Sequence, residues 1–141
     1  MSAPANTLVN IPVKVAGDLS AVNAYAILRE IEALLERLVA GGEAGAIDLR
    51  ALPLAPADRE LLASELGEGE VSASIQANGL SVVRETAYAG VWWVTHRDEN
   101  DAVVAEFIEV CAIPEVLKSQ QADMSNALAR LRLRADTGAA A

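Results

Sequence analysis

The chain has 141 residues, of which 52% are hydrophobic and 22% charged, a composition typical of one globular domain rather than of a disordered segment. Its formal net charge of −9 argues against nucleic acid and anionic membranes as partners, because both are bound through clustered lysine and arginine. The single cysteine cannot form an intrachain disulfide, no export signal is recognisable, and no apolar run approaches the roughly 20 residues that span a bilayer, so we expect a cytoplasmic protein.

Three segments are predicted along the chain. Residues 1–18 are rich in proline and small residues and are expected to form an extended N-terminal arm. Residues 19–135 are expected to form a single domain, and residues 136–141 a flexible tail.

The first half of the domain is predicted to be helical. Apolar residues recur at helical spacing over residues 20–40, and a glycine pair ends that helix. A second helix begins at Pro56, because proline is tolerated in a first helical turn, and it ends at Gly67. Residues 46–49 are expected to form only a short extended link between the two helices.

The second half changes to the period of two that is typical of strands. Strands are expected over residues 71–76, 80–86, 90–96 and 103–112. Asn78-Gly79 predicts a tight hairpin turn between the first two strands, because both central positions of such a turn take a positive φ.

A last helix is predicted to begin at Pro114. Its inner, core-facing positions are expected to be Val116, Leu117, Met124, Leu128 and Leu131. Its arginines, which form the only basic cluster of the chain and are interpreted as a solvated helix end, are Arg130, Arg132 and Arg134. The predicted fold class is therefore α+β, an antiparallel β meander of about four strands packed with about three helices.

Residues 65–76, ELGEGEVSASIQ, have the glycine spacing of a dinucleotide-binding loop but not its context. Such a loop leaves a strand and opens a helix, whereas here Gly67 ends a helix and Gly69 opens a strand. Glu68 and Glu70 would also repel a phosphate at close range. We interpret the stretch as a helix stop followed by a strand start, with glycine's access to positive φ explaining both glycines.

A metal or nucleophilic site would have to use His96 and Cys111. Together with Glu85 and Glu109 they are the only plausible mixed cluster, yet none shows the close spacing of zinc ligands and no glycine-framed nucleophile elbow is present. We expect Cys111 to be a small buried residue and His96 a polar residue at a strand end. The sequence thus predicts no catalytic residue, no metal ligand and no cofactor.

Glu106 and Glu109 lie on opposite faces of one predicted strand, each among apolar residues. The favoured interpretation pairs each with an arginine such as Arg84 or Arg97, because buried acids are usually paired. The alternative places one of these carboxylates at a binding groove.

Trp92 and Trp93 are adjacent on a strand, so their side chains point to opposite faces of the sheet. Either both are buried in the core, or one is exposed and forms a contact patch for a partner. The sequence leaves both alternatives open.

Several segments together resemble a known family, the HupH/HyaF hydrogenase expression proteins. The resemblance covers about residues 47–133 and, with strong agreement in order and spacing, rests on IDLRALPLAPADRELLASELGEGEVSASI, ETAYAGVWWVTH and EFIEVCAIPEVL. It implies an accessory protein for the maturation of a nickel–iron uptake hydrogenase, and not an enzyme. Members of the family assist the iron–sulfur small subunit, which carries a twin-arginine export signal, before it joins the large subunit.

The implied partners are the hydrogenase small subunit or its signal segment and other hydrogenase accessory proteins. Longer members of the family contain this module twice, so this shorter chain is expected either to self-associate as a homodimer or to bind only part of the partner set. The predicted partner-binding surface consists of Glu70, Glu85, Trp92, Trp93 and Glu109. Two rival hypotheses are a metal- or cluster-handling protein that uses His96 and Cys111, and a module whose task is self-association.

Overall fold

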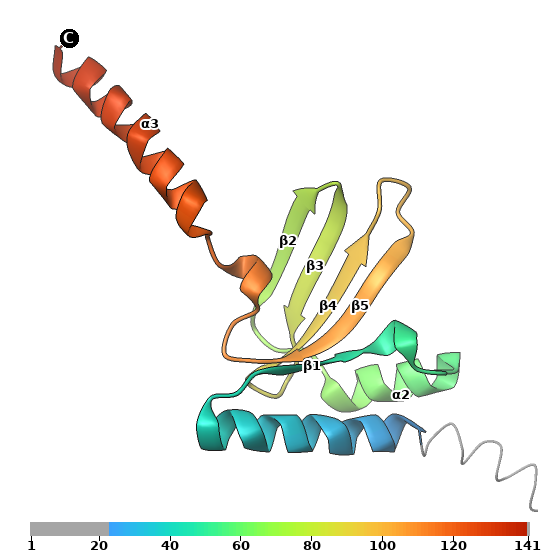
Figure 1. The fold of residues 1–141 in the computed structure, drawn as a ribbon. Coiled ribbons are helices and arrows are strands. Elements are labelled where there is room, and N and C mark those ends of the chain that lie inside the picture. The colour runs from blue at the N-terminus through green and yellow to red at the C-terminus, as the bar shows by residue number, and fades with distance from the viewer. Residues whose placement is uncertain (1–22, 141) are drawn as a thin grey trace, which may run out of the picture.

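The computed structural model describes residues 23–140 as an α+β fold, with two helices on one face of an antiparallel sheet and a third helix that extends away from it (Figure 1). The predicted arm, residues 1–18, lies outside the described residues. Along the chain the elements are a first helix at residues 23–41, β1 (Gly45–Asp48), the 3-10 turn η1 (Leu49–Ala51), α2 (Pro56–Leu66), β2 (Ser72–Ala77), β3 (Gly79–Glu85), β4 (Val91–Arg97), β5 (Val103–Val110), the 3-10 turn η2 (Glu115–Leu117) and α3 (Gln121–Ala140).

The sheet confirms the predicted meander and adds a strand to it. The strand order is β1-β5-β4-β3-β2, with every neighbouring pair antiparallel. The added strand, β1, falls where we expected only a link, and it pairs Ile47 with Ile108 of β5. Four residues are too few to show a period, and the partner strand is distant in sequence, so no local pattern predicts this pairing.

The β2–β3 hairpin lies at the predicted Asn78-Gly79 position, but its turn differs from the predicted one. Gly79 has a φ of 130°, whereas Asn78 is not among the residues with positive φ. A Cβ atom on Gly79 would lie 2.1 Å from the backbone oxygen of Arg97. Glycine is therefore required here by close backbone contact as well as by φ.

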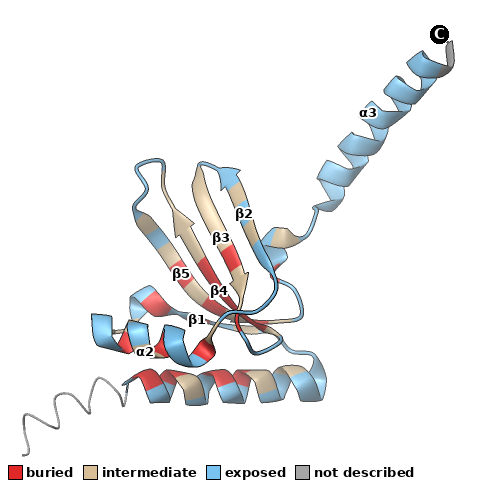
Figure 2. Ribbon diagram, turned by 180° about the vertical axis from the view of Figure 1, so that it is seen from behind, coloured by how far each residue is buried: buried red, intermediate tan, exposed pale blue. Residues whose placement is uncertain are grey.

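The main hydrophobic core lies between the two helices and one face of the sheet, where Figure 2 shows many of the buried residues. The helices contribute Ile27, Ile31, Leu34, Leu62 and Leu66, and the sheet contributes Ile47, Val91, Trp93, Ile108 and Val110. The helical stripes predicted from the sequence are thus buried, which places both helices on the same face of the sheet.

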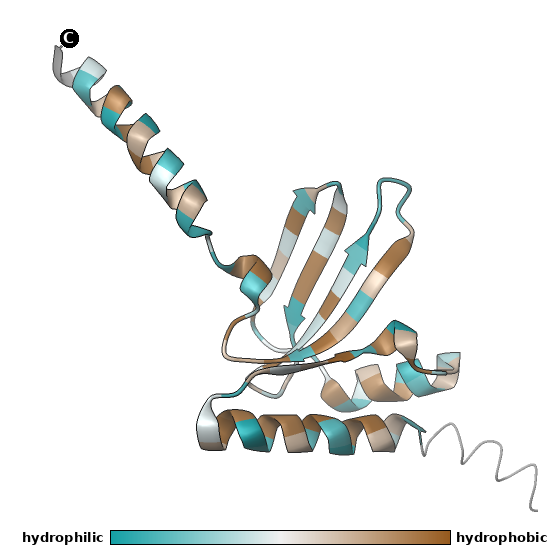
Figure 3. Ribbon diagram, viewed as in Figure 1, coloured by the Kyte–Doolittle hydropathy of each residue, from teal (hydrophilic) through white to brown (hydrophobic). Residues whose placement is uncertain are grey.

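The last helix corrects the sequence-based prediction. Pro114 leads into η2 rather than into a long helix, and α3 begins only at Gln121. Every described side chain of α3 is exposed, including the predicted inner positions Met124, Leu128 and Leu131. Its apolar bands therefore face solvent in Figure 3, and the predicted start of the tail at residue 136 lies inside the helix.

Candidate interaction surfaces

The five residues of the predicted partner-binding surface do not share one surface. Strand register places Glu85 opposite Trp92 and Trp92 opposite Glu109, so these three form a row across β3, β4 and β5. They lie on the side of the sheet that the first helix and α2 leave uncovered. Trp93 pairs with Ile108 on the opposite, helix-covered face, and Glu70 lies exposed before β2.

We call the uncovered side of the sheet the open face. Alternation along the paired strands assigns to it the following side chains: Ala46, Asp48, Ala73, Ile75, Ala77, Ser81, Val83, Glu85, Trp92, Val94, His96, Ala105, Phe107 and Glu109. Its centre is a second, smaller cluster in which Ile75, Cys111 and Leu117 are only partly buried. Among the described residues, η2 is the only helical turn that packs on the open face, so this face is only partly covered.

Both tryptophans are core residues, which answers the question that the sequence left open. Trp92 is 4% exposed and Trp93 is 6% exposed. The Trp92 indole N–H donates to the backbone oxygen of Cys111 over 3.1 Å, and that of Trp93 donates to Glu106 over 2.8 Å. Neither indole is exposed to a partner, so each can contribute to a binding surface only by packing under the exposed side chains.

Glu106 is a buried carboxylate with an arginine partner, as expected, but the arginine is not one of those predicted. Arg59 of α2 forms the ion pair, and Trp93 donates to the second carboxylate oxygen. Arg84 and Arg97 instead pair with acids on the surface. The Glu106 network thus ties α2 to β4 and β5, which gives this acid a structural role.

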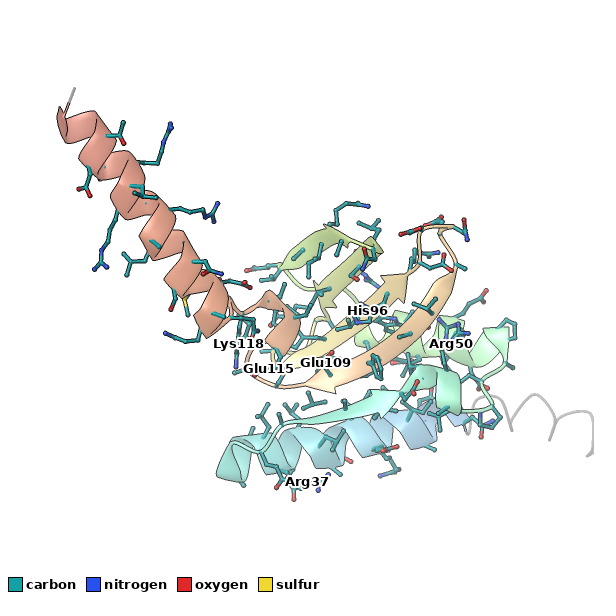
Figure 4. The ribbon with its side chains drawn as sticks, turned by 45° about the horizontal axis from the view of Figure 1, so that its top comes forward. Arg37, Arg50, His96, Glu109, Glu115 and Lys118 are labelled. Atoms are coloured by element: carbon teal, nitrogen blue, oxygen red, sulfur yellow. The ribbon has the colours of Figure 1, made fainter. Side chains whose placement is uncertain are left out.

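Glu109 is a titratable side chain of the open face whose pKa is shifted from its ordinary value. Burial disfavours its ionised form and raises its pKa, an effect that His96 reduces and Glu115 reinforces. Figure 4 shows Glu109, His96, Glu115 and Lys118 on this side of the molecule. Glu115 is paired with Lys118, whereas Glu109 forms no ion pair within residues 23–140, so the prediction of an arginine partner for Glu109 is wrong there. The open face therefore carries acids at its margin.

The metal-handling hypothesis finds no support in the described part of the chain. Within it, no three His, Cys, Asp or Glu side chains are grouped closely enough to hold a metal ion. His96 Nδ1 lies 2.8 Å from the hydroxyl of Ser81, and its ring packs edge-on against Phe107. Cys111 is half-buried, and burial together with Glu109 raises the pKa of its thiol to about 11.

This pKa predicts that Cys111 is a slow nucleophile. With a pKa of about 11, roughly a thousandth of the thiol is ionised at pH 8, and only the thiolate attacks. We expect the native protein to react with iodoacetamide at pH 8 at about a hundredth of the rate of the urea-unfolded chain, and the native rate to rise about tenfold per pH unit up to pH 10. Intact-mass spectrometry measures this directly because the chain has one cysteine. Equal native and unfolded rates at pH 8 would contradict the prediction.

A second surface, which the sequence analysis missed, is a groove on the helical side of the molecule. It encloses about 860 Å³ between the first helix, the end of α2 and the turn after β3. Its apolar lining comes from Tyr25, Leu28, Ile31, Leu35, Val39, Leu66, Tyr88 and Val91, and its charged residues are Arg29, Glu32, Glu36 and Glu65. We call this site the helix groove.

The two tyrosines of the chain are the most informative residues of the helix groove. Tyr25 is 49% exposed and Tyr88 is 54% exposed, although both are large aromatic side chains. They lie far apart in sequence and line the same groove because the first helix packs beside the β3–β4 turn. Exposed aromatic side chains that line an apolar groove are typical of a protein-contact site.

Fold and groove together are those of a small acidic α+β domain that presents an apolar contact surface. The chain belongs to the HupH hydrogenase expression protein family, because the model of that family's C-terminal conserved region matches residues 21–137. The structure is similar to that of hydrogenase expression protein HupH from Thiobacillus denitrificans, with a TM-score of 0.79 and 50% identity over 82% of this chain and 96% of that one.

Two curated relatives carry related names. Hydrogenase expression/formation protein HoxQ of Azotobacter vinelandii is 36% identical over 87 residues, which are 62% of this chain and 31% of the relative. Hydrogenase expression/formation protein HupH of Rhodobacter capsulatus is 34% identical over 113 residues, which are 79% of this chain and 40% of the relative. The chain thus spans about a third of the length of the curated relatives it matches. Within residues 23–140, no helix combines the length and apolarity needed to cross a bilayer.

Proposed function

We propose that this chain is a non-enzymatic, cytoplasmic accessory protein in hydrogenase maturation, and that it binds the iron–sulfur small subunit through its export signal. Family membership and the names of the relatives support the maturation role. The small subunit as partner rests on the resemblance, which links the family to a protein with a twin-arginine signal.

The helix groove is the observation that carries this proposal. An export signal joins basic residues to a short apolar run. The groove has the complementary chemistry, because its apolar wall meets a margin on which three of the four charged residues are carboxylates. An apolar helix laid against Leu28, Leu35 and Val39 would bring its arginines towards Glu32 and Glu36.

The previously predicted acids Glu70, Glu85 and Glu109 provide the competing location for the same partner. They lie outside the groove, and two of them share the open face. We assign the partner to the groove because it has exposed aromatic side chains, whereas the aromatic residues among the predicted contacts are buried. The experiment must therefore separate the two locations.

Co-expression of the tagged chain with the small-subunit precursor, followed by quantitative pull-down, makes this separation. We expect Tyr25→Ser/Tyr88→Ser to lower recovery of the precursor at least about tenfold, because truncating central aromatic contacts typically costs 1 kcal/mol or more each. Both side chains are half-exposed, so the fold should survive the change. Val104→Ser, which truncates an exposed apolar residue of β5 outside the groove, is the matched control and should retain wild-type recovery.

A charge variant provides a second test of the helix groove as the binding site. Glu32→Gln/Glu36→Gln should weaken recovery and reduce its dependence on salt, since charge pairs at an interface are screened. Unchanged recovery in both groove variants would remove the groove as the site. Loss of recovery in Glu85→Gln/Glu109→Gln alone would move the site to the open face.

A further inference from the structure

Helix α3 presents an apolar stripe that no other element within residues 23–140 covers. Met124, Leu128 and Leu131 follow one another at spacings of four and three residues, so they lie on one side of the helix. All three are exposed, with Leu131 at 67%. Most helices in proteins are stabilised by packing of an apolar face, so such a stripe is normally buried against another element. The family model extends to residue 137, so α3 belongs to the family's module.

The charges of α3 specify what kind of surface would cover it. At 100° per residue, Arg132 and Arg134 lie on either side of the apolar stripe, whereas Arg130 lies further round the helix, as do Asp123 and Asp136. Two arginines thus flank the stripe in a chain whose net charge is −9. The complementary surface is a partly exposed apolar area with acids at its margin.

The open face has this composition. Ile75 and Leu117 are partly buried members of its apolar cluster, and Glu85, Glu109 and Glu115 lie on or beside it. None of these acids is in a salt bridge within the described residues except Glu115, whose partner is Lys118. A helix of 20 residues is about 30 Å long and can therefore cross the whole sheet, whose strands lie about 4.8 Å apart.

From the position that it occupies in the structure, α3 cannot cover the open face of its own chain. Residues 118–120 connect η2 to α3, and the helix runs away from the sheet from there (Figure 1). A second copy of the chain offers the same open face to this α3 and an equivalent α3 in return. Such reciprocal exchange closes with two-fold symmetry and leaves neither helix nor sheet face uncovered.

We propose that the chain forms a homodimer in which each α3 lies on the open face of the other copy. The stripe of Met124, Leu128 and Leu131 would pack on the apolar cluster, and the flanking arginines would approach Glu85 and Glu109. This inference is independent of the proposed function, since the helix groove is on the other side of the sheet and stays accessible in the dimer.

The mass of the full-length chain in solution, measured by light scattering after gel filtration, tests the proposal. The wild type is expected to have twice the mass of the chain. Leu128→Glu/Leu131→Glu should weaken dimerisation at least about a hundredfold and yield monomer, because two apolar side chains lose their burial and two charges enter the interface. The domain should keep its thermal stability apart from the dimer's contribution, because α3 makes no core contact.

Leu133→Glu is the matched control. Leu133 is 69% exposed, like Leu131, but it lies on the side of α3 opposite the stripe, so this variant should remain dimeric. Arg132→Glu/Arg134→Glu should be monomeric, and mixing it with Glu85→Arg/Glu109→Arg should restore a heterodimer through one reversed pair of contacts.

A monomeric wild type, or a dimer that survives Leu128→Glu/Leu131→Glu, would overturn the proposal. A monomeric wild type whose stripe variant loses the small-subunit precursor would assign α3 to that partner instead, and would also count against the dimer. The groove variant Tyr25→Ser/Tyr88→Ser is expected to remain dimeric. Failure of the proposed function and failure of the dimer are therefore seen in different variants.

Discussion

Trp93→Ala is expected to lower the free energy of unfolding by about 4 kcal/mol, because truncating a buried aromatic residue loses its transfer free energy and leaves a cavity. Trp93 is buried in the main core, and its indole N–H donates to the buried carboxylate of Glu106. Urea denaturation followed by far-ultraviolet circular dichroism measures the change. A loss below about 1 kcal/mol would contradict the role of Trp93 in the core.

Trp93→Phe separates packing from hydrogen bonding in the same position. It keeps a buried ring but removes the donor to Glu106, so we expect a smaller loss of about 1 to 3 kcal/mol. Because both substitutions act on stability, a loss of partner binding in Trp93→Ala does not identify a contact. The half-exposed residues of the helix groove are better probes of binding.

Gly69→Ala is expected to have the second largest effect, a loss of about 3 kcal/mol in the free energy of unfolding. A Cβ atom at this position would lie 2.3 Å from the backbone oxygen of Thr86, and backbone cannot move aside as a flexible side chain can. The Gly69 N–H also donates to the backbone oxygen of Glu85 over 2.9 Å, which holds the two segments together.

Gly41→Ala is the matched control for this prediction. An added Cβ atom there meets no heavy atom within 4 Å, and Gly41 lies in the last turn of the first helix. We expect the free energy of unfolding to stay the same or rise by up to about 1 kcal/mol, because alanine favours helix over glycine. Thermal melts of both variants give the comparison. Equal stability of Gly69→Ala and the wild type would refute the close-contact account.

The Gly69 geometry also corrects the sequence-based explanation of ELGEGEVSASIQ. Gly67 has a φ of 64°, as expected of a glycine that ends a helix. Gly69 is not among the glycines with positive φ, so its requirement comes from the proximity of another backbone segment. A local sequence pattern cannot predict that requirement, since the neighbouring backbone, that of Glu85 and Thr86, follows only after the β2–β3 hairpin.

Two contact surfaces on opposite sides of one sheet are compatible with simultaneous use. The helix groove lies beside the first helix and α2, and the open face lies across the sheet from them. In our proposals the groove receives the maturation partner and the open face receives α3 of a second copy. The dimer would then present two grooves and could hold two partner segments.

The sequence by itself determined the elements whose pattern is local. Strands β2 to β5 follow from alternation, and the first two helices follow from apolar spacing and from the stops before Gly42 and Gly67. The family could also be identified from the sequence, because its segments occur in the right order and spacing. In each case the information lies within a few neighbouring residues, where period and turn chemistry act directly.

Only the tertiary structure decided which distant segments meet. It paired β1 with β5, gave Glu106 the partner Arg59, buried both tryptophans and placed Tyr25 and Tyr88 in one groove. It also left the apolar stripe of α3 exposed, although the same spacing in the first helix is buried. Periodicity predicts that an apolar stripe will be buried. The surface that buries it depends on the path of the chain and on its partners.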